Sequence, residues 1–217
     1  MKSVLIIGMG RFGRHLCKQM ADLGNEIMIV DQLEENLEEA MPYAVSAKIG
    51  DCTNETVLKS LGIANFDICF VCIGTNFQSS LEITSLVKEL GASRVVSKAT
   101  RDIQAKFLLR NGADEVIYPD RDIAERVAVR YSNSGIFDYM ELSKEYSFCE
   151  ILPLKRWLNK SLKDLNMRRA YHISVIGVKQ DEDIKVMPSA DYVIQENDHL
   201  IVIGKNEDVD KILRSIY

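Results

Sequence analysis

Three glycines in the stretch SVLIIGMGRFGRHL are the feature that most constrains how this chain folds. Gly8, Gly10 and Gly13 follow an apolar run and precede a segment of helical periodicity, the pattern of a G-x-G-x-x-G turn between strand and helix. The first glycine permits the tight turn, the second lets a pyrophosphate approach the backbone, and the third lets helix and strand pack closely. The unpaired N–H groups at the helix start favour the bound anion.

A carboxylate lies where it can bind the ribose of such a ligand. Asp31 directly follows the apolar run EIMIV, at the end of the second predicted strand, and Gln32 is the next residue. An acidic side chain there accepts hydrogen bonds from both ribose hydroxyls and repels a 2′-phosphate. The glycine turn and Asp31 together predict an adenine nucleotide other than NADP; a turn that binds nothing is the alternative.

Later strand ends are predicted to add to the same site. Asp51, which Cys52 follows, comes after the third apolar run, where its carboxylate can contact the adenine edge. The segment Ile73–Thr75 follows the fourth run, and Gly74 within it lets the ligand lie close. Lys98 ends the fifth run near the expected phosphates, although a solvated strand end is the alternative.

Apolar runs alternate with segments of helical periodicity as far as Asp120. The runs SVLIIG, EIMIV, AVSAKIG, DICFVCIG, RVVSKA and EVIYP are typical of buried strands. Four predicted helices are each followed by a glycine, which a left-handed C-terminal cap requires. The alternation predicts an α/β fold with a Rossmann-like, doubly wound parallel sheet. The predicted helices are Phe12–Leu23, Glu34–Met41, Glu55–Leu61, Phe77–Leu90 and Ile103–Asn111, and the capping glycines are Gly24, Gly62, Gly91 and Gly112.

Beyond Asp120 a second, smaller domain is predicted. DIAERVAVRYSNS indicates an amphipathic helix that ends in a polar turn, and GIFDYMELSKEYSFCEILPL alternates like paired strands. NKSLKDLNMRRAY indicates a short helix and an exposed basic turn, HISVIGVK, DIKVMP and DHLIVIG indicate strands, and EDVDKILRSI indicates a closing helix. With a boundary near Asn133–Gly135, residues 1–133 form the nucleotide-binding domain and residues 134–217 an α+β domain.

Composition excludes several other classes of protein. The net charge of −5 and the pI of about 5.3 argue against a nucleic-acid-binding protein, which normally has a basic face. No apolar run approaches the roughly 20 residues that cross a bilayer, and the N-terminus lacks a secretory pattern, so we expect a cytoplasmic chain. Cys69 and Cys72 have CxxC spacing, but residues three apart in one strand face opposite sides. We expect core cysteines rather than a metal site.

The sequence gives little support for catalysis. A nicotinamide-dependent dehydrogenase needs a second domain that brings a proton donor to the cofactor. None of the 8 tyrosines is followed four residues later by lysine, and the 3 histidines, His15, His172 and His199, lie far apart without a surrounding motif. We predict that the nucleotide is sensed rather than transformed; a small NAD-dependent oxidoreductase is the alternative.

Several motifs resemble those of regulator-of-K⁺-conductance (RCK) proteins, especially the KtrA/TrkA-type subunits of bacterial potassium-uptake systems. They are IIGMGRFGRHL, VDQLEENLEE, GDCTNETVLKSLGI, VCIGTNFQSSL, VVSKA and GADEVIYPDRDIAERVA, followed by SLKDLNMRRAY and DHLIVIG. The resemblance covers essentially the whole chain and implies ATP, ADP or NAD(H) in the N-terminal domain. It places Phe12 in the specific RFG segment and Arg11 at the nucleotide phosphates. The residues that match the family's nucleotide positions are Gly8, Gly10, Gly13, Asp31, Asp51, Gly74 and Lys98.

The resemblance also implies partners. Members form homodimers, often assembled into an octameric ring, and dock on a TrkH/KtrB-like membrane subunit that conducts K⁺. The chain is thus expected at the inner face of the cell membrane, as a subunit of such a transporter or as a sensor for a different carrier.

Two further ligands follow from the resemblance. Asp120 stands where some relatives have a glutamate that holds a divalent cation, Mg²⁺ or Ca²⁺, between paired nucleotides. Asn166 and Arg168 match positions that bind cyclic di-AMP in some relatives; an ordinary surface turn is the alternative.

Overall fold

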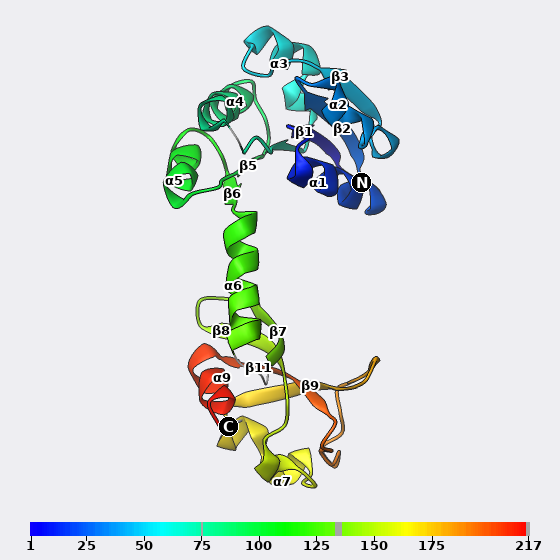
Figure 1. Cartoon of the computed structure of the whole chain (residues 1–217), viewed down its shortest axis with the longest axis vertical. Helices are drawn as coiled ribbons and strands as arrows, with labels where there is room; N and C mark the ends of the chain where they lie inside the picture. Colours follow the sequence, from blue (N-terminus) through cyan, green and yellow to red (C-terminus); the bar gives the residue numbers. More distant parts are fainter. Residues whose placement is uncertain (75, 133–135, 216–217) are drawn as a thin grey trace. The chain divides into compact units, whose positions relative to one another are not determined.

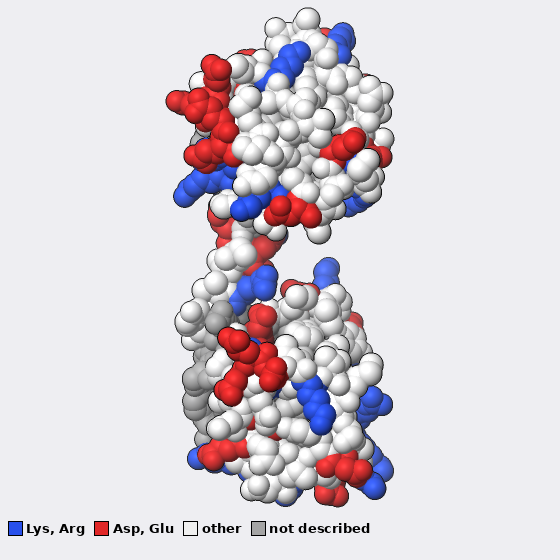
Figure 2. Space-filling model, turned by 90° about the vertical axis from the view of Figure 1, so that its right-hand side faces the viewer, with Lys and Arg blue, Asp and Glu red and all other residues white. Residues whose placement is uncertain are grey.

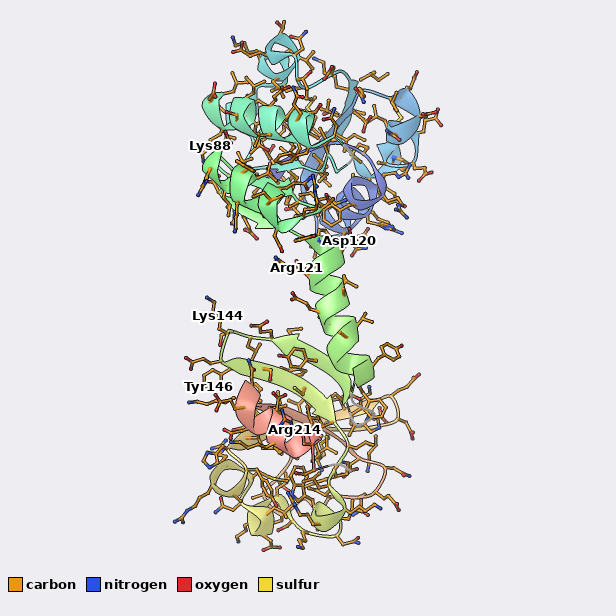
Figure 3. All side chains as sticks on the ribbon, turned by 60° about the vertical axis from the view of Figure 1, so that its left-hand side comes forward. Lys88, Asp120, Arg121, Lys144, Tyr146 and Arg214 are labelled. Atoms are coloured by element: carbon orange, nitrogen blue, oxygen red, sulfur yellow. The ribbon has the colours of Figure 1, made fainter. Side chains whose placement is uncertain are left out.

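The computed structural model describes residues 1–74, 76–132 and 136–215 of the chain. It divides into two compact units, Met1–Arg121 and Asp122–Tyr217 (Figure 1). The division falls inside helix α6 (Pro119–Ser132), whose first turn carries Asp120 and Arg121 (Figure 3). The predicted boundary at Asn133–Gly135 lies outside the described residues. On the face shown in Figure 2, acidic and basic side chains are both spread over each unit.

The first unit is built on a six-stranded parallel sheet in the order β3-β2-β1-β4-β5-β6. This order confirms the predicted doubly wound fold. Strands β2 and β3 are added on one side of β1 and strands β4 to β6 on the other, so the strand order reverses between the parallel neighbours β1 and β4. The strands are β1 (Ser3–Ile7), β2 (Glu26–Asp31), β3 (Ser46–Ile49), β4 (Ile68–Val71), β5 (Val95–Lys98) and β6 (Glu115–Ile117).

Helices cover both faces of this sheet, as the alternating sequence requires. Ile7 and Val71 pack on one face with Leu58 of α3 and Ile83 of α4, and the opposite face packs against Cys17 of α1 and Leu37 of α2. The helices are α1 (Arg11–Asp22), α2 (Glu34–Glu38), α3 (Glu55–Leu61), α4 (Phe77–Glu89) and α5 (Asp102–Arg110).

Two local predictions about these helices have different outcomes. All four predicted capping glycines have left-handed backbones, with φ between +68° at Gly62 and +108° at Gly112. The second helix ends at Glu38 rather than at the predicted Met41, and Met41–Tyr43 forms a separate 3-10 turn. Pro42 explains the early end, because it lacks the N–H that would bond the carbonyl of Glu38 and its ring would clash with that carbonyl in a continuous helix.

Cys69 and Cys72 lie in the core clusters of opposite sheet faces, as predicted. Burial raises the pKa of each thiol to about 12. Both side chains therefore act as small apolar groups at neutral pH.

The second unit contains a five-stranded antiparallel sheet in the order β10-β9-β11-β8-β7. The predicted strand pairs and closing helix are confirmed, whereas the predicted basic turn forms a second short helix, α8 (Met167–Ala170). A left-handed Asn166 (φ 44°) joins α8 to α7 (Leu162–Leu165) and so allows two successive helical turns. The other elements are β7 (Ile136–Glu141), β8 (Tyr146–Ile151), a 3-10 turn (Lys155–Trp157), β9 (Ile173–Gln180), β10 (Asp183–Val186), β11 (His199–Lys205) and α9 (Asn206–Leu213).

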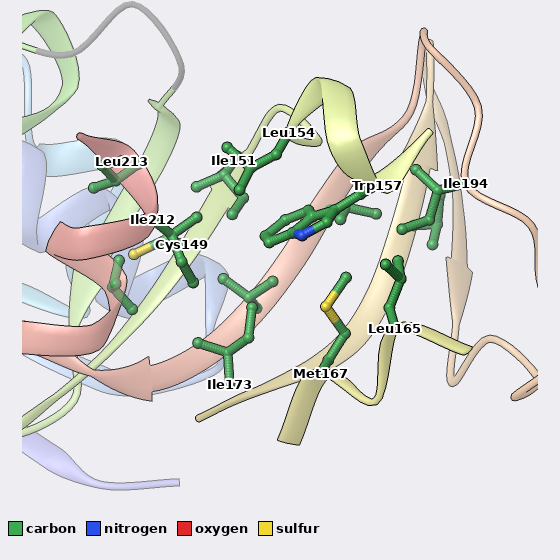
Figure 4. Packing of buried hydrophobic residues seen from close by; sticks show 14 residues of the cluster. Cys149, Ile151, Leu154, Trp157, Leu165, Met167, Ile173, Ile194, Ile212 and Leu213 are labelled. Carbon is green, nitrogen blue, oxygen red and sulfur yellow. The ribbon is translucent and has the colours of Figure 1, made fainter. Parts of the chain in front are cut away.

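Trp157 is the largest fully buried side chain of the second unit. Its ring lies among Leu154, Leu165 and Met167, and α9 adds Ile212 to the same cluster (Figure 4). Helix α9 and the short helices thus pack on one face of the antiparallel sheet. Across the described part of the chain, no helix is both long enough and apolar enough to span a membrane.

Candidate functional site

The glycine turn has the geometry that its sequence requires. Gly8 has a φ of +94°, and a Cβ on Gly13 would lie 2.1 Å from the carbonyl oxygen of Gly8. A side chain at either position is therefore excluded by conformation or by contact. Gly10 differs, because a Cβ there would meet no atom within 4 Å. The space above Gly10 is open, as a ligand that approaches the backbone needs.

Helix α1 begins at Arg11, immediately after this turn. No side chain caps its N-terminus, and its first turn contains no acidic residue. The first N–H groups of a helix have no partner within it, and together with the helix dipole they attract an anion. Arg11 is exposed at this end and adds a fixed positive charge.

Asp31 is held beside the turn by hydrogen bonds to both carboxylate oxygens. Oδ2 accepts the N–H of Met9 at 2.7 Å, and Oδ1 accepts the N–H of Leu33 at 2.9 Å and the amide of Asn36 at 3.0 Å. An ionised carboxylate has about four acceptor positions, so one remains for a single ribose hydroxyl rather than for the two that the sequence pattern predicted. Gln32 is exposed next to it. The sequence pattern located Asp31 but gave no signal for Met9 or Asn36.

Asp51 and Cys52 follow β3 and differ in orientation. The Asp51 carboxylate is exposed, and its Oδ1 accepts the N–H and the hydroxyl of Thr53 at 2.9 and 2.8 Å. The Cys52 side chain is 4% exposed and lies in the core, and burial raises its pKa to about 12. Cys52 therefore offers a ligand only its backbone.

The carboxyl ends of β4 and β5 place the positively charged side chain of Lys98 next to Gly74. A Cβ on Gly74 would lie 3.3 Å from Nζ of Lys98, and this Nζ lies 5.6 Å from the ring centre of Phe12. Ile73 contacts the turn, since its Cγ1 would be 3.0 Å from a Cβ on Gly8. Thr100 also lines this edge beside Gly74, and the strand-end rule applied to SKAT would have found it. Thr75 lies outside the described residues.

The structure thus groups most of the predicted nucleotide residues at the carboxyl ends of β1, β2, β4 and β5. Asp120 is exposed in the first turn of α6, and Asn166 and Arg168 are exposed in the second unit. Within the described residues, no group of three His, Cys, Asp or Glu side chains is arranged to hold a metal ion.

Comparison with known proteins connects this geometry to a family. The TrkA-N domain matches residues 4–119, and the TrkA-C domain matches residues 150–217. Ktr system potassium uptake protein C of Bacillus subtilis is 39% identical, with 99% of this chain and 97% of that protein covered. Ktr system potassium uptake protein A of Vibrio alginolyticus is 29% identical, with 99% and 98% covered.

Solved structures agree in fold. The GsuK channel superimposes with a TM-score of 0.71 at 16% identity over 99% of this chain, and the GsuK channel bound to NAD with a TM-score of 0.66 at 16% identity over 100%. This chain spans 39% of the length of each of those chains. The resemblance to RCK proteins of the KtrA/TrkA type is confirmed, and the chain belongs to the family whose members join a TrkA-N domain to a TrkA-C domain.

Proposed function

We propose that this protein is the nucleotide-binding regulatory subunit of a potassium-uptake system. The observation that carries the proposal is the open, uncapped glycine turn beside Asp31, in a chain that matches a Ktr potassium uptake protein over 99% of its length. The ligand is ATP, ADP or NAD(H). The partner is a membrane subunit that conducts K⁺, and the chain works at the inner face of the membrane through that partner.

Each part of the nucleotide has a proposed contact. The α1 N–H groups, Arg11 and Lys98 take the phosphates, because they supply the positive charge at the turn. Asp31 takes the ribose, and Asp51 with the Cys52 backbone takes the adenine. Gly10 and Gly74 leave room for the ligand, with Phe12, Gln32, Ile73 and Thr75 around it.

Arg11 is proposed to distinguish ATP from ADP. A fixed charge at the helix start gains most when the ligand carries charge beyond a pyrophosphate, whereas Asp31 contacts the part that both ligands share. Arg11→Ala should weaken ATP more than ADP, by roughly ten- to a hundredfold. Calorimetric titration of both nucleotides measures this, with Asp31→Asn as the variant that weakens both alike. An unchanged ATP/ADP ratio in Arg11→Ala removes this residue from the discrimination.

The proposal that the protein regulates without catalysis can be tested against the alternative, a small NAD-dependent oxidoreductase. The candidate nucleotide site contains glycines, carboxylates and cations. Among the described residues, the histidine that pairs with a carboxylate is His199, whose Nδ1 lies 2.7 Å from Glu150 Oε1, and both residues belong to the second unit rather than to the candidate site. Purified protein should bind an adenine nucleotide and leave NADH absorbance constant with common alcohols and carbonyl compounds. Steady NADH turnover with any of them contradicts the proposal.

We propose that the chain forms a homodimer that assembles further into an octameric ring, and the surface of α6 supports the pairing of two copies. Ile123, Val127 and Tyr131 follow a four-residue spacing along one side of this helix and are 56%, 47% and 78% exposed. Apolar side chains at that spacing form a stripe typical of helix pairing. We propose that two copies bury this stripe.

Two further sites are proposed from single residues. A divalent cation at Asp120 would take its other ligands from paired nucleotides, and Asp120→Ala should remove any effect of Mg²⁺ or Ca²⁺ on nucleotide affinity. Cyclic di-AMP would contact Asn166 and Arg168, and its calorimetric affinity for the full chain should fall in Arg168→Ala. Equal results for wild type and variant exclude the respective site.

A further inference from the structure

A pocket in the second unit has no role in the proposed nucleotide site. Its volume is about 230 Å³, and Arg156, Tyr171, His172, Asp208, Lys211 and Ser215 line it. These residues come from the Lys155–Trp157 turn, the connection between α8 and β9, and helix α9 with the residue pair after it. Three separate segments of the second unit therefore line one pocket that is open to solvent.

The charge of this pocket favours an anion. Lys211 Nζ lies 2.9 Å from Asp208 Oδ1, so this lysine and the one lining carboxylate form an ion pair. Lys211, and to a lesser extent His172 and Lys205, lower the pKa of Asp208, so the carboxylate stays ionised. Arg156 is the uncompensated charge: among the described residues it forms no ion pair, and its guanidinium lies 5.6 Å from the ring centre of Tyr171.

Two residues of the pocket wall, Tyr171 and Ile212, are packed against the hydrophobic core. Tyr171 packs edge-on against the fully buried Trp157, with ring centres 4.9 Å apart. Ile212 belongs both to the pocket lining and to the core cluster. His172 has a φ of 57°, an uncommon conformation for a side chain other than glycine, and it turns the chain toward β9 at the pocket. The aromatic and apolar side of the pocket is therefore held in place by core packing.

We propose that this pocket binds a phosphate group, either inorganic phosphate or a small phosphomonoester. A guanidinium binds a phosphate in bidentate fashion, Lys211 adds a point charge, and the Tyr171 ring covers a short carbon chain. At about 230 Å³ the cavity is smaller than the roughly 300–1,000 Å³ of typical drug-sized pockets, which favours a ligand smaller than a nucleotide. Arg168 does not line the pocket, so the site differs from the one proposed for cyclic di-AMP.

Trp157 makes the proposal directly testable, because it is the only tryptophan of the chain and contacts a pocket residue. Its fluorescence in the full-length protein is followed during titration with inorganic phosphate and, separately, with glycerol 3-phosphate, at ionic strength matched with KCl. Ligand at the glycine turn leaves this reporter without a direct contact, so the outcome is independent of the proposed nucleotide site.

We expect a saturable change with at least one of the two ligands, and the tighter of them identifies the source of the phosphate. Arg156→Gln should raise the half-saturation concentration by roughly ten- to a hundredfold, and Lys211→Gln should also raise it. Arg169→Gln, at an exposed arginine of α8 that does not line the pocket, should leave it unchanged. Arg156 and Lys211 are exposed, so their variants should keep the wild-type melting temperature without ligand. The absence of a saturable change with both ligands, or an equal response in Arg156→Gln, overturns the proposal.

Discussion

Among single residues, the three glycines of the turn have three different physical roles. Gly8 needs its left-handed backbone, Gly13 needs the absence of a Cβ, and Gly10 needs neither for folding, since it has an ordinary φ of −64° and open space around it. The absence of a side chain at Gly10 instead allows a ligand to approach the backbone. Stability and binding can therefore be separated by substituting glycines only three residues apart.

Gly13→Ala should lower the free energy of unfolding by about 3 kcal/mol, because the new methyl would overlap the Gly8 carbonyl oxygen at 2.1 Å. Gly10→Ala should leave stability within about 0.5 kcal/mol but abolish nucleotide binding. Urea unfolding and calorimetric titration of both variants check this pair. A Gly10→Ala protein that binds ADP with wild-type affinity contradicts the assignment of the turn.

The sequence located the side chains of this site whose positions follow from a strand end. Asp31, Gly74 and Lys98 each end or follow a strand, and parallel strands bring their carboxyl ends to one edge. The contact of Asn36 with Asp31 could not be predicted, because this hydrogen bond depends on the backbone conformation between β2 and α2. Cys52 shows the opposite case: the strand-end rule placed its backbone but not its side chain, which turned into the core.

At the scale of elements, a single carboxylate ties together three parts of the sheet edge. Asp114, just before β6, accepts hydrogen bonds from Lys88 Nζ of α4 at 2.7 and 2.9 Å and from the N–H of Val95 in β5 at 2.7 Å. The Lys88 hydrogen bond is the main cause that lowers the pKa of Asp114, and the Val95 N–H adds to it. This arrangement joins α4, β5 and β6.

Asp114→Asn should destabilise the first unit by about 1 kcal/mol at pH 7, since both partners remain partly exposed. The folded pKa is lowered, so the stabilisation is complete above the ordinary carboxyl pKa of about 3.9 and is lost as the pH falls through the lower folded value. The difference between wild type and variant in urea unfolding should therefore shrink below about pH 4. Glu55→Gln, which removes an exposed ion pair with Lys59, is the control and should change stability by less than about 0.5 kcal/mol. An Asp114→Asn effect that stays constant down to pH 3 contradicts this account.

Element boundaries were less predictable than element order. Strand and helix order in the first unit followed from the hydrophobic period and the capping glycines, whereas α2 ended early at Glu38, ahead of Pro42, and the predicted basic turn formed α8. In both cases one residue decided the local geometry: a proline that cannot continue a helix, and a left-handed Asn166 that permits a second one. Hydrophobic periodicity is judged over a window of many residues, so it does not detect the effect of a single residue on where a helix ends or begins.

For the whole molecule, the sequence predicted two domains from the change of pattern after Asp120. The chain divides into its two units within α6, between Arg121 and Asp122, and the predicted division at residues 133 and 134 stays a prediction. The oligomeric state could not be predicted from hydrophobic periodicity. An apolar stripe on a helix predicts that the stripe is buried, but not whether it packs within the chain or against a second copy. Only the exposure of Ile123 and Val127 in the folded chain identifies them as candidates for pairing.

The stripe on α6 makes a direct prediction about mass. Light scattering of the wild-type protein should give a multiple of 24.6 kDa, the mass of one chain. Ile123→Glu combined with Val127→Glu should lower the particle mass, since two like charges would face each other across a buried interface. Leu23→Glu, at a residue 76% exposed near the end of α1, is the control and should keep the wild-type mass. A wild-type mass of one chain, or an unchanged mass in the double variant, contradicts pairing through α6.

The central claim is that nucleotide bound at the glycine turn controls potassium uptake through a membrane partner. The most direct measurement is K⁺ uptake by cells that lack this protein and receive either wild type or Gly10→Ala, with equal protein levels verified. Because Gly10→Ala is expected to remove nucleotide binding without disturbing the fold, wild type should restore the nucleotide-regulated uptake and the variant should not. Equal K⁺ uptake in deleted, wild-type and Gly10→Ala cells would contradict the account.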